Sequence, residues 1–129
     1  MRIMHVMAGA AEGGAENIML ESVLALAEAG LTQHVVTRPD NQFRVQNFRE
    51  AGIGVDVAAF NNAWPFPTRR VLGEAIKAFK PDVIEYWMGR AGQFAPKEYR
   101  NRSVAWYGGY YKLARFLNCE WHVGLTIDL

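Results

Sequence analysis

The pattern of apolar and polar positions changes period repeatedly along the chain. Short continuous apolar runs are typical of strands buried on both faces of a parallel sheet. They alternate with stretches in which apolar residues recur every three or four positions, as on one side of a helix. The apolar runs predict strands at 3–7, 33–37, 53–60, 83–87, 104–107 and 121–125. The other stretches predict helices at 15–29, 41–51 and 68–79, a short helix near Pro96 and a helical turn or two at 110–116.

Glycine, proline and threonine mark the expected ends of several of these elements. Gly30 and Gly52 stand where the first two helices should end, since glycine readily adopts the left-handed conformation found after a helix. Segment 61–67 contains two prolines and is expected to be a loop, after which Thr68 is expected to cap the third helix. Alternation at this spacing predicts an α/β fold with a largely parallel sheet and helices on both of its faces.

Composition and charge limit the class of protein. The 129 residues suffice for one compact domain, and half of them are hydrophobic while 21% are charged, as in an ordinary globular protein. The 14 Lys and Arg residues are balanced by 13 Asp and Glu residues, which leaves a net charge of +1. Because proteins that bind nucleic acid through its phosphates need a clear excess of positive charge, no nucleic-acid partner is expected.

The single cysteine and the N-terminal sequence indicate a cytoplasmic protein. Cys119 cannot form an internal disulfide, and the N-terminus lacks the apolar segment and cleavage site of a signal peptide. No stretch approaches the roughly 20 apolar residues of a membrane-spanning helix, although peripheral contact with the inner face of a membrane is left open. The chain stops just beyond its last expected strand without a helix to cover it. We therefore expect residues 1–129 to be a domain truncated at its C-terminal end.

Three glycine-containing loops should open on one edge of the sheet, because ligands of such sheets bind beyond the carboxyl ends of the strands. In the first loop, Gly13 and Gly14 begin a helix whose amide groups and dipole favour a phosphate; the alternative is a simple tight turn. Glu16 either completes a capping interaction or faces the cleft. The glycine spacing of dinucleotide-binding folds and the Lys-Ser/Thr of P-loops are both absent, which disfavours those two cofactor classes.

The loop after the fourth expected strand carries charged and aromatic candidates. Glu85 precedes Trp87 by two residues, and a carboxylate on a buried strand is costly unless it is paired or open to solvent. We therefore expect Glu85 near the rim of a cleft. Arg90 is suited to grip a phosphate or carboxylate, or else it pairs with Glu85.

The loop after the fifth expected strand offers glycines and flat aromatic faces. Gly108, Gly109 and Tyr110 follow Trp106, a combination that suits packing against sugar rings. Core packing of at least two of the aromatic residues in this segment is the alternative.

The histidines and the cysteine do not form a recognisable site. His5, His34 and His122 lie on separate expected strands without the spacing of metal ligands, so no metal site is expected. No Ser-His-Asp or Cys-His pattern is present, and Cys119 is expected to be inert.

Several segments resemble nucleotide-sugar-dependent glycosyltransferases of the GT-B architecture, in particular the large retaining family, family 4, that includes sucrose synthases and many bacterial lipopolysaccharide and mannosyl transferases. The similarity runs over nearly the whole chain, and the "GGAE" that opens the first helix is its most specific motif. The segments that carry it are "MRIMHV", "GGAE", "HVVT", "KPDVIEYW", "WM-x-R", "GGYYKLARFLNCEW" and "CEWHVGLTIDL".

The resemblance implies a Rossmann-like three-layer sandwich that forms the N-terminal, acceptor-side half of a GT-B enzyme. Gly13, Gly14 and Glu16 would then lie against the donor diphosphate and the acceptor. It further implies a nucleotide sugar as substrate with no cofactor or metal, a saccharide or lipid-linked acceptor, and a C-terminal donor-binding domain without which the 129 residues are inactive. Many relatives have histidine where this chain has Glu85 and Trp87, so no catalytic residue can be transferred.

The function that follows is transfer of a hexose to a cell-surface polysaccharide or lipopolysaccharide-type acceptor. Two alternatives stay open: a stand-alone, non-enzymatic α/β binding module, and a nucleotide-sugar epimerase of the same architecture. The loop "AWPFP" adds one further question, since Trp64 and Phe66 either meet lipid or a lipid-linked acceptor, or pack inside the domain.

Overall fold

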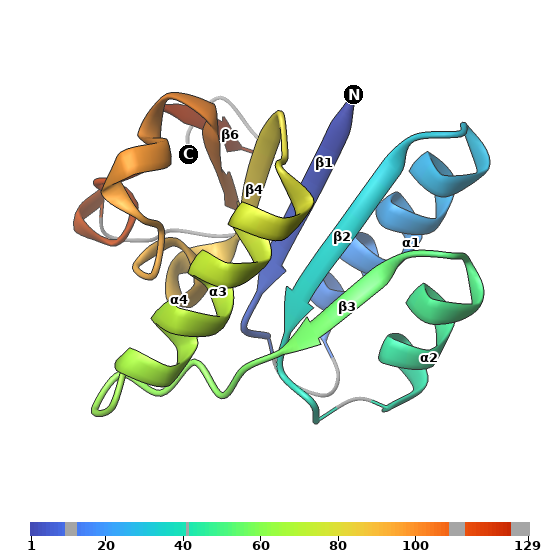
Figure 1. Cartoon of the computed structure of the whole chain (residues 1–129), viewed down its shortest axis with the longest axis horizontal. Helices are drawn as coiled ribbons and strands as arrows, with labels where there is room; N and C mark the ends of the chain where they lie inside the picture. The colour runs from blue at the N-terminus through green and yellow to red at the C-terminus, as the bar shows by residue number, and fades with distance from the viewer. Residues whose placement is uncertain (10–12, 41, 109–112, 125–129) are drawn as a thin grey trace.

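The computed structural model describes residues 1–9, 13–40, 42–108 and 113–124 as six strands, four α-helices and two 3-10 helices (Figure 1). The strands are β1 (Arg2–Met7), β2 (Thr32–Thr37), β3 (Gly54–Val57), β4 (Val83–Trp87), β5 (Ser103–Tyr107) and β6 (Trp121–Gly124). The helices are α1 (Gly14–Glu28), α2 (Gln42–Glu50), α3 (Phe66–Phe79), α4 (Met88–Gly92), η1 (Lys97–Arg102) and η2 (Leu113–Phe116).

The six strands form one parallel sheet in the order β3-β2-β1-β4-β5-β6. This is the strand order of the doubly wound, Rossmann-like fold, and it confirms the expected α/β class. The direction of strand succession reverses between β1 and β4, where His5 pairs with Glu85 and Met7 with Trp87. In sheets of this kind the crevice for ligands opens beyond the carboxyl ends of the strands at that reversal.

The two faces of the sheet are covered by different helices, because successive residues of a strand point to opposite faces. We call them the α1 face and the α3 face. On the α1 face, Met7 and Val35 pack with Met19 and Val23 of α1 and with Phe48 of α2. On the α3 face the core consists chiefly of Met4, Val6, Val36, Ile84 and Tyr86 with Leu72 and Ile76 of α3 and Ala91 of α4. Figure 1 shows the resulting layers, with α3 in front of the sheet and α1 behind it.

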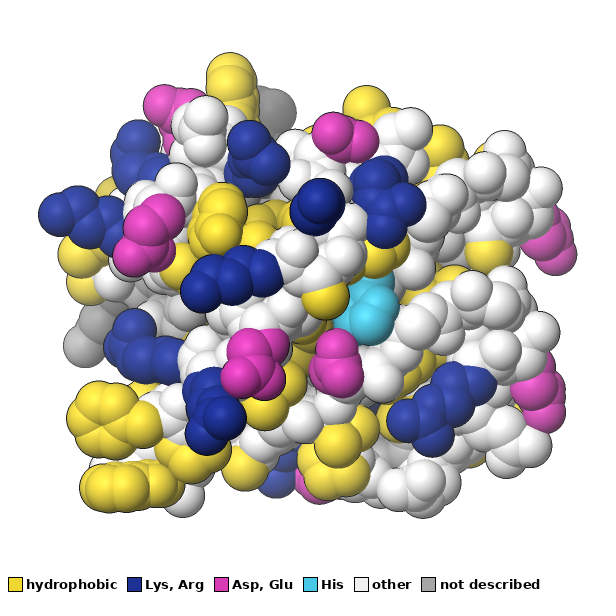
Figure 2. Space-filling view, in the orientation of Figure 1, with side chains coloured by type: hydrophobic (Ala, Val, Ile, Leu, Met, Phe, Trp, Pro, Cys, Tyr) yellow, Lys and Arg dark blue, Asp and Glu magenta, His cyan; other side chains and the backbone are white. Residues whose placement is uncertain are grey.

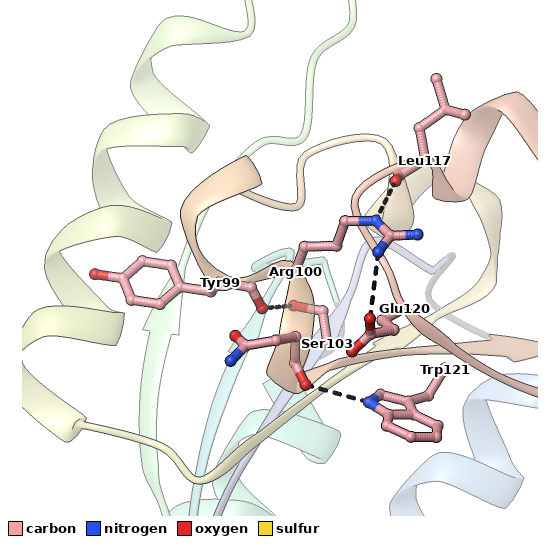
Figure 3. A network of polar contacts seen from close by, with 7 residues as sticks. Tyr99, Arg100, Ser103, Leu117, Glu120 and Trp121 are labelled. Carbon is pink, nitrogen blue, oxygen red and sulfur yellow. Dashed lines mark hydrogen bonds and ion pairs between the residues drawn. The ribbon is translucent and has the colours of Figure 1, made fainter.

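A polar network fixes η1 against the start of β6 (Figure 3). Arg100 donates from Nε to the carbonyl of Leu117 at 3.1 Å, and its guanidinium lies 3.5 Å from Glu120. Trp121 donates its indole N–H to the carbonyl of Asn101 at 3.1 Å. These contacts gather near the amino ends of β5 and β6, so they support the sheet at the edge opposite the crevice.

The structure corrects the expected start of the third helix. Helix α3 begins at Phe66 with Pro65 as its N-cap residue, and Thr68 makes no capping bond. Pro67 is already set for the first turn of a helix, so the helix starts before Thr68. The threonine hydroxyl is instead buried and accepts the backbone N–H of Phe60 at 2.9 Å.

Two other expectations about elements are also corrected. Strand β3 is only four residues long, because the chain turns away from the sheet and Phe60 takes a left-handed backbone conformation with its ring buried. Residues 88–92 form the short helix α4, where the sequence predicts a loop around Gly89 and Gly92. Here tertiary packing overrides glycine's low helix propensity, since the ring of Phe116 occupies the space that a Cβ at Gly92 would need.

Candidate functional site

The candidate site lies at the carboxyl edge of the sheet, where β1 and β4 are neighbours and their connections leave on opposite faces. The chain after β1 leads to α1, and the chain after β4 leads directly into α4. The end of β5 reaches the same place, because a Cβ at Gly108 would lie 3.6 Å from the Cβ of Ala15 in the first turn of α1. The topology therefore brings together the described parts of the three loops that the sequence singles out.

The glycine loop, for which the structure describes Ala8, Gly9 and Gly13, is shaped around the side chain of Glu16. A Cβ at Gly9 would lie 2.6 Å from a carboxylate oxygen of Glu16, and a Cβ at Gly13 would collide with the other oxygen. Any larger residue at either position would push this carboxylate away. Glu16 is 9% exposed and folds back over the loop rather than outward. The Glu16 side chain therefore packs against Gly9 and Gly13.

Gly14 has a different environment from the other two glycines of the loop. It is the first residue of α1, it is exposed, and no atom of the described residues lies within 4 Å of the position that its Cβ would take. The N-cap residue Gly13 has no side chain that could cap the helix. The first turn of a helix has amide groups without partners inside the helix, and these carry the positive end of its dipole. The start of α1 therefore offers both open space, beside Gly14, and a positive electrostatic potential that favours an anion.

Arg44 of α2 is a charged residue of this region that the sequence analysis missed. It is 1% exposed, and burial lowers the pKa of its guanidinium, while the negative charges of Glu16 and Asp40 act in the opposite direction. A buried arginine beside Glu16 places a positive charge behind the glycine loop. The sequence holds no signal for it, since Arg44 lies between Phe43 and Val45 in an otherwise polar helix, and it is the arginine, not Phe43, that is buried.

Glu85 lies on the α1 face beside His5, in a network of buried polar side chains. His5 is completely buried; its Nε2 lies 2.7 Å from Oε1 of Gln33, and Trp87 donates its indole N–H to His5 Nδ1 at 3.2 Å. Gln33 in turn donates to the carbonyl of Val23 at 2.8 Å. With Nδ1 as an acceptor, Nε2 carries the proton and the imidazole is neutral.

The contact between Glu85 and His5 is therefore not an ion pair at neutral pH. A carboxylate oxygen of Glu85 lies 3.6 Å from His5 Nδ1. Burial lowers the pKa of His5 to about 4, against the opposing effect of its hydrogen bond to Gln33, and burial raises the pKa of Glu85 to about 7. Both shifts favour the uncharged forms. Glu85 retains 22% of its side-chain exposure, so it is a half-buried carboxyl group that titrates near neutrality.

Trp87 is buried, whereas Arg90 is exposed. Trp87 is 3% exposed and packs against Trp106 with ring centroids 4.6 Å apart, so it belongs to the core. Arg90 is exposed on α4, and among the ion pairs between described residues none joins it to Glu85.

Between Trp87 and Arg90, Met88 has a backbone φ of 70°, which is unusual for a residue with a side chain and often marks a functional site. The sequence analysis missed Met88.

The remaining candidates divide between described and undescribed residues. Gly108 is exposed, and a Cβ there would lie 2.8 Å from the ring of Trp106, so a glycine is needed for this approach. Gly109 and Tyr110 lie outside the described residues.

Burial raises the pKa of the Cys119 thiol to about 12, which agrees with an inert cysteine. Across the described ranges, no three His, Cys, Asp or Glu side chains are grouped as metal ligands.

With this geometry described, the chain can be compared with known proteins. No protein-family model matches it. It is 30% identical over 130 residues to the lipopolysaccharide core biosynthesis glycosyltransferase LpsD of Rhizobium meliloti (strain 1021); the match takes in all of this chain and 38% of that protein. In fold it matches the crystal structure of a glycosyltransferase from Rickettsia africae ESF-5 with a TM-score of 0.66 and 19% identity, over 85% of this chain and 30% of the other.

The chain is similar to glycosyltransferases. The sequence match is to a glycosyltransferase of lipopolysaccharide core biosynthesis, and the structural match, at its low identity, concerns the Rossmann-like fold. This chain spans 38% of the length of the relative that it matches in sequence. The expected fold class is thus confirmed, while the activity of the whole protein belongs to the proposal below.

Proposed function

We propose that this chain is the N-terminal, acceptor-side domain of a retaining, family 4-like glycosyltransferase with the GT-B architecture. The enzyme transfers a hexose from a nucleotide sugar to a cell-surface polysaccharide or lipopolysaccharide-type acceptor in the cytoplasm. The observation that carries the proposal is the 30% identity to LpsD along the whole of this chain. A glycine loop and an open helix start at the reversal of strand order support it.

The chemistry assigned to this domain is binding and charge stabilisation. Transfer releases a nucleoside diphosphate, and fixed dipoles directed at the developing negative charge lower the barrier for its departure. The first turn of α1 offers such dipoles, and the open space beside Gly14 lets a ligand approach the backbone closely. Arg44 adds a buried positive charge behind the loop, partly balanced by Glu16. No cofactor or metal enters this scheme.

The other half of the cleft is assigned to a separate donor-binding domain. In the proposed architecture this domain contributes the groups that recognise the nucleotide and the sugar, so the 129 residues alone do not catalyse transfer. We assign Gly13, Gly14, Glu16, Arg90 and Gly108 to the walls of this cleft. To Glu85 and Trp87 we assign a supporting role at the end of β4.

Product analysis tests the proposal. A full-length protein that contains this chain and the proposed donor-binding domain is incubated with a radiolabelled nucleotide sugar, with and without truncated lipopolysaccharide as acceptor, and both the sugar and the acceptor are recovered. A transferase labels the acceptor and releases a nucleoside diphosphate only when acceptor is present. An epimerase would change the sugar without acceptor, and a binding module would change neither; either result would contradict the proposal.

A further inference from the structure

The end of the loop before α3 and the first residue of that helix each expose an aromatic side chain to solvent. Trp64 is 63% exposed and Phe66 is 64% exposed. Their rings lie edge to face, with centroids 5.3 Å apart at an interplanar angle of 78°. Of the two readings that the sequence leaves open, packing inside the domain is therefore wrong, and the aromatic pair lies on the surface.

This loop is braced in its exposed position. The side-chain oxygen of Asn61 accepts the backbone N–H groups of Ala63 at 2.9 Å and Trp64 at 3.3 Å. Gln93 donates to the side chain of Asn62 at 2.7 Å, and Pro65 lies between the two aromatic residues. Exposing large apolar surface is unfavourable, and neighbouring apolar side chains held at the surface are typical of sites that contact another molecule.

Positive charge lies next to the aromatic pair. Arg69 and Arg70 follow Phe66 by three and four positions, so on α3 all three side chains lie on one side of the helix. The Arg70 side chain is 81% exposed and forms a surface pair with Glu74 at 3.1 Å. At the corner where Figure 1 places the start of α3, Figure 2 shows projecting apolar rings with dark blue basic side chains close by.

The basic surface continues along α3. Arg69 and Phe94 line a hollow of about 210 Å³ beside the loop and also a groove of about 580 Å³, whose walls include Lys77 and Lys97. Glu98 also lines this groove, so three basic side chains face one acidic side chain there. The aromatic pair thus lies near a groove with an excess of positive charge.

We propose that Trp64, Phe66, Arg69 and Arg70 form a docking surface for the headgroup region of an anionic lipid bilayer. Tryptophan and phenylalanine are suited to the membrane interface, and each arginine near an anionic surface adds to the attraction. Two projecting rings are too small an apolar surface for a stable protein interface, which needs roughly 800 Å² per partner. They suffice for shallow insertion supported by charge. None of the described helices is long and apolar enough to cross a membrane.

The position of this surface connects it to the candidate site. The loop follows β3 at the carboxyl edge of the sheet, the edge on which the glycine loop also lies (Figure 1). Docking would therefore turn the cleft toward the lipid surface. This consequence, unlike the docking itself, rests on the proposed function, because it presents the cleft to a lipid-linked acceptor.

Cosedimentation with vesicles tests the docking surface. The protein is mixed with vesicles of equal parts phosphatidylglycerol and phosphatidylcholine, or of phosphatidylcholine alone. We expect binding to the anionic vesicles that weakens with added salt. Trp64→Ser/Phe66→Ser should weaken it about tenfold or more, and Arg69→Gln/Arg70→Gln by about thirtyfold. Phe43→Ser is the matched control, because Phe43 is 70% exposed on α2, and it should leave binding unchanged.

Three results would overturn the proposal. The first is the absence of binding to anionic vesicles, and the second is an equal loss of binding in the Phe43→Ser control. The third is a change of oligomeric state in the Trp64→Ser/Phe66→Ser protein during gel filtration without lipid, which would assign the surface to a protein contact. Because the assay contains no nucleotide sugar, its failure would leave the transferase proposal standing.

Discussion

At the scale of single residues, Glu85 and His5 have pKa values that burial shifts in opposite directions. Burial raises the pKa of the Glu85 carboxyl group from 4.5 to about 7. The folded protein therefore loses stability as the pH rises from about 4.5 through 7. Burial lowers the pKa of the His5 imidazole from 6.5 to about 4. Stability is therefore lost as the pH falls from about 6.5 through 4. Between pH 4.5 and 6.5 the two effects oppose each other.

We therefore expect Glu85→Gln to separate these effects. At pH 8 the variant should be more stable than the natural protein by about 2 kcal/mol, because a charge that is costly to bury has been removed. At pH 5, where folded Glu85 is protonated, the difference should nearly vanish. Urea unfolding at both pH values measures this. A variant that is less stable at pH 8 would show that ionised Glu85 has a stabilising partner.

The close packing of Glu16 on the glycine loop gives a second prediction. Gly9→Ala should destabilise the protein by about 1 to 3 kcal/mol, because the new Cβ would lie 2.6 Å from Glu16 Oε1. Adding Glu16→Ala should recover much of that loss, since the obstructing side chain is then gone. A double-mutant cycle measured by chemical unfolding gives the coupling. Strictly additive effects would mean that Gly9 is needed for another reason.

At the scale of elements, one buried side chain ties three of them together. Gln33 of β2 bonds to His5 of β1 and to the carbonyl of Val23 in α1. Gln33→Leu should cost about 1 to 3 kcal/mol of unfolding free energy, because the buried His5 N–H loses its partner. Gln46→Leu serves as control, since Gln46 also makes a side-chain bond, to Glu50, but on the exposed side of α2. Equal effects of the two substitutions would contradict the assigned role of Gln33.

How far these elements can be predicted depends on whether their cause is local. The central strands can be predicted from the sequence because they are buried on both faces and consist mainly of apolar residues, as at 83–87, where Glu85 is the exception. Helix α4 could not be predicted from the local sequence, because it depends on the packing of Phe116 against Gly92, which lies 24 positions away in the chain. The three loops of the candidate site follow from the alternation of elements, whereas the burial of Arg44 and the backbone of Met88 depend on contacts that no local pattern encodes.

At the scale of the whole molecule, topology determines which distant segments meet. The reversal of strand order brings the connection after β1 beside the connection after β4, and the end of β5 reaches the first turn of α1. The loop that exposes Trp64 and Phe66 leaves β3 at this same edge. The polar network around Arg100 lies at the opposite edge of the sheet, where it stabilises the fold. The proposed cleft and the proposed docking surface would therefore lie on the same edge of the sheet.

The central claim is that the start of α1 receives the donor diphosphate. The most direct test is the rate of sugar transfer by a full-length protein, with the proposed donor-binding domain present, that carries Gly14→Leu. The space beside Gly14 is empty within the described chain, so leucine should fold normally there and yet obstruct the ligand. Gly73→Leu in α3 is the matched control, because Gly73 is also a helical glycine with nothing within 4 Å of its Cβ position. We predict that kcat/KM falls by about 100-fold or more in Gly14→Leu and is unchanged in Gly73→Leu. Full activity of a correctly folded Gly14→Leu protein would contradict the claim.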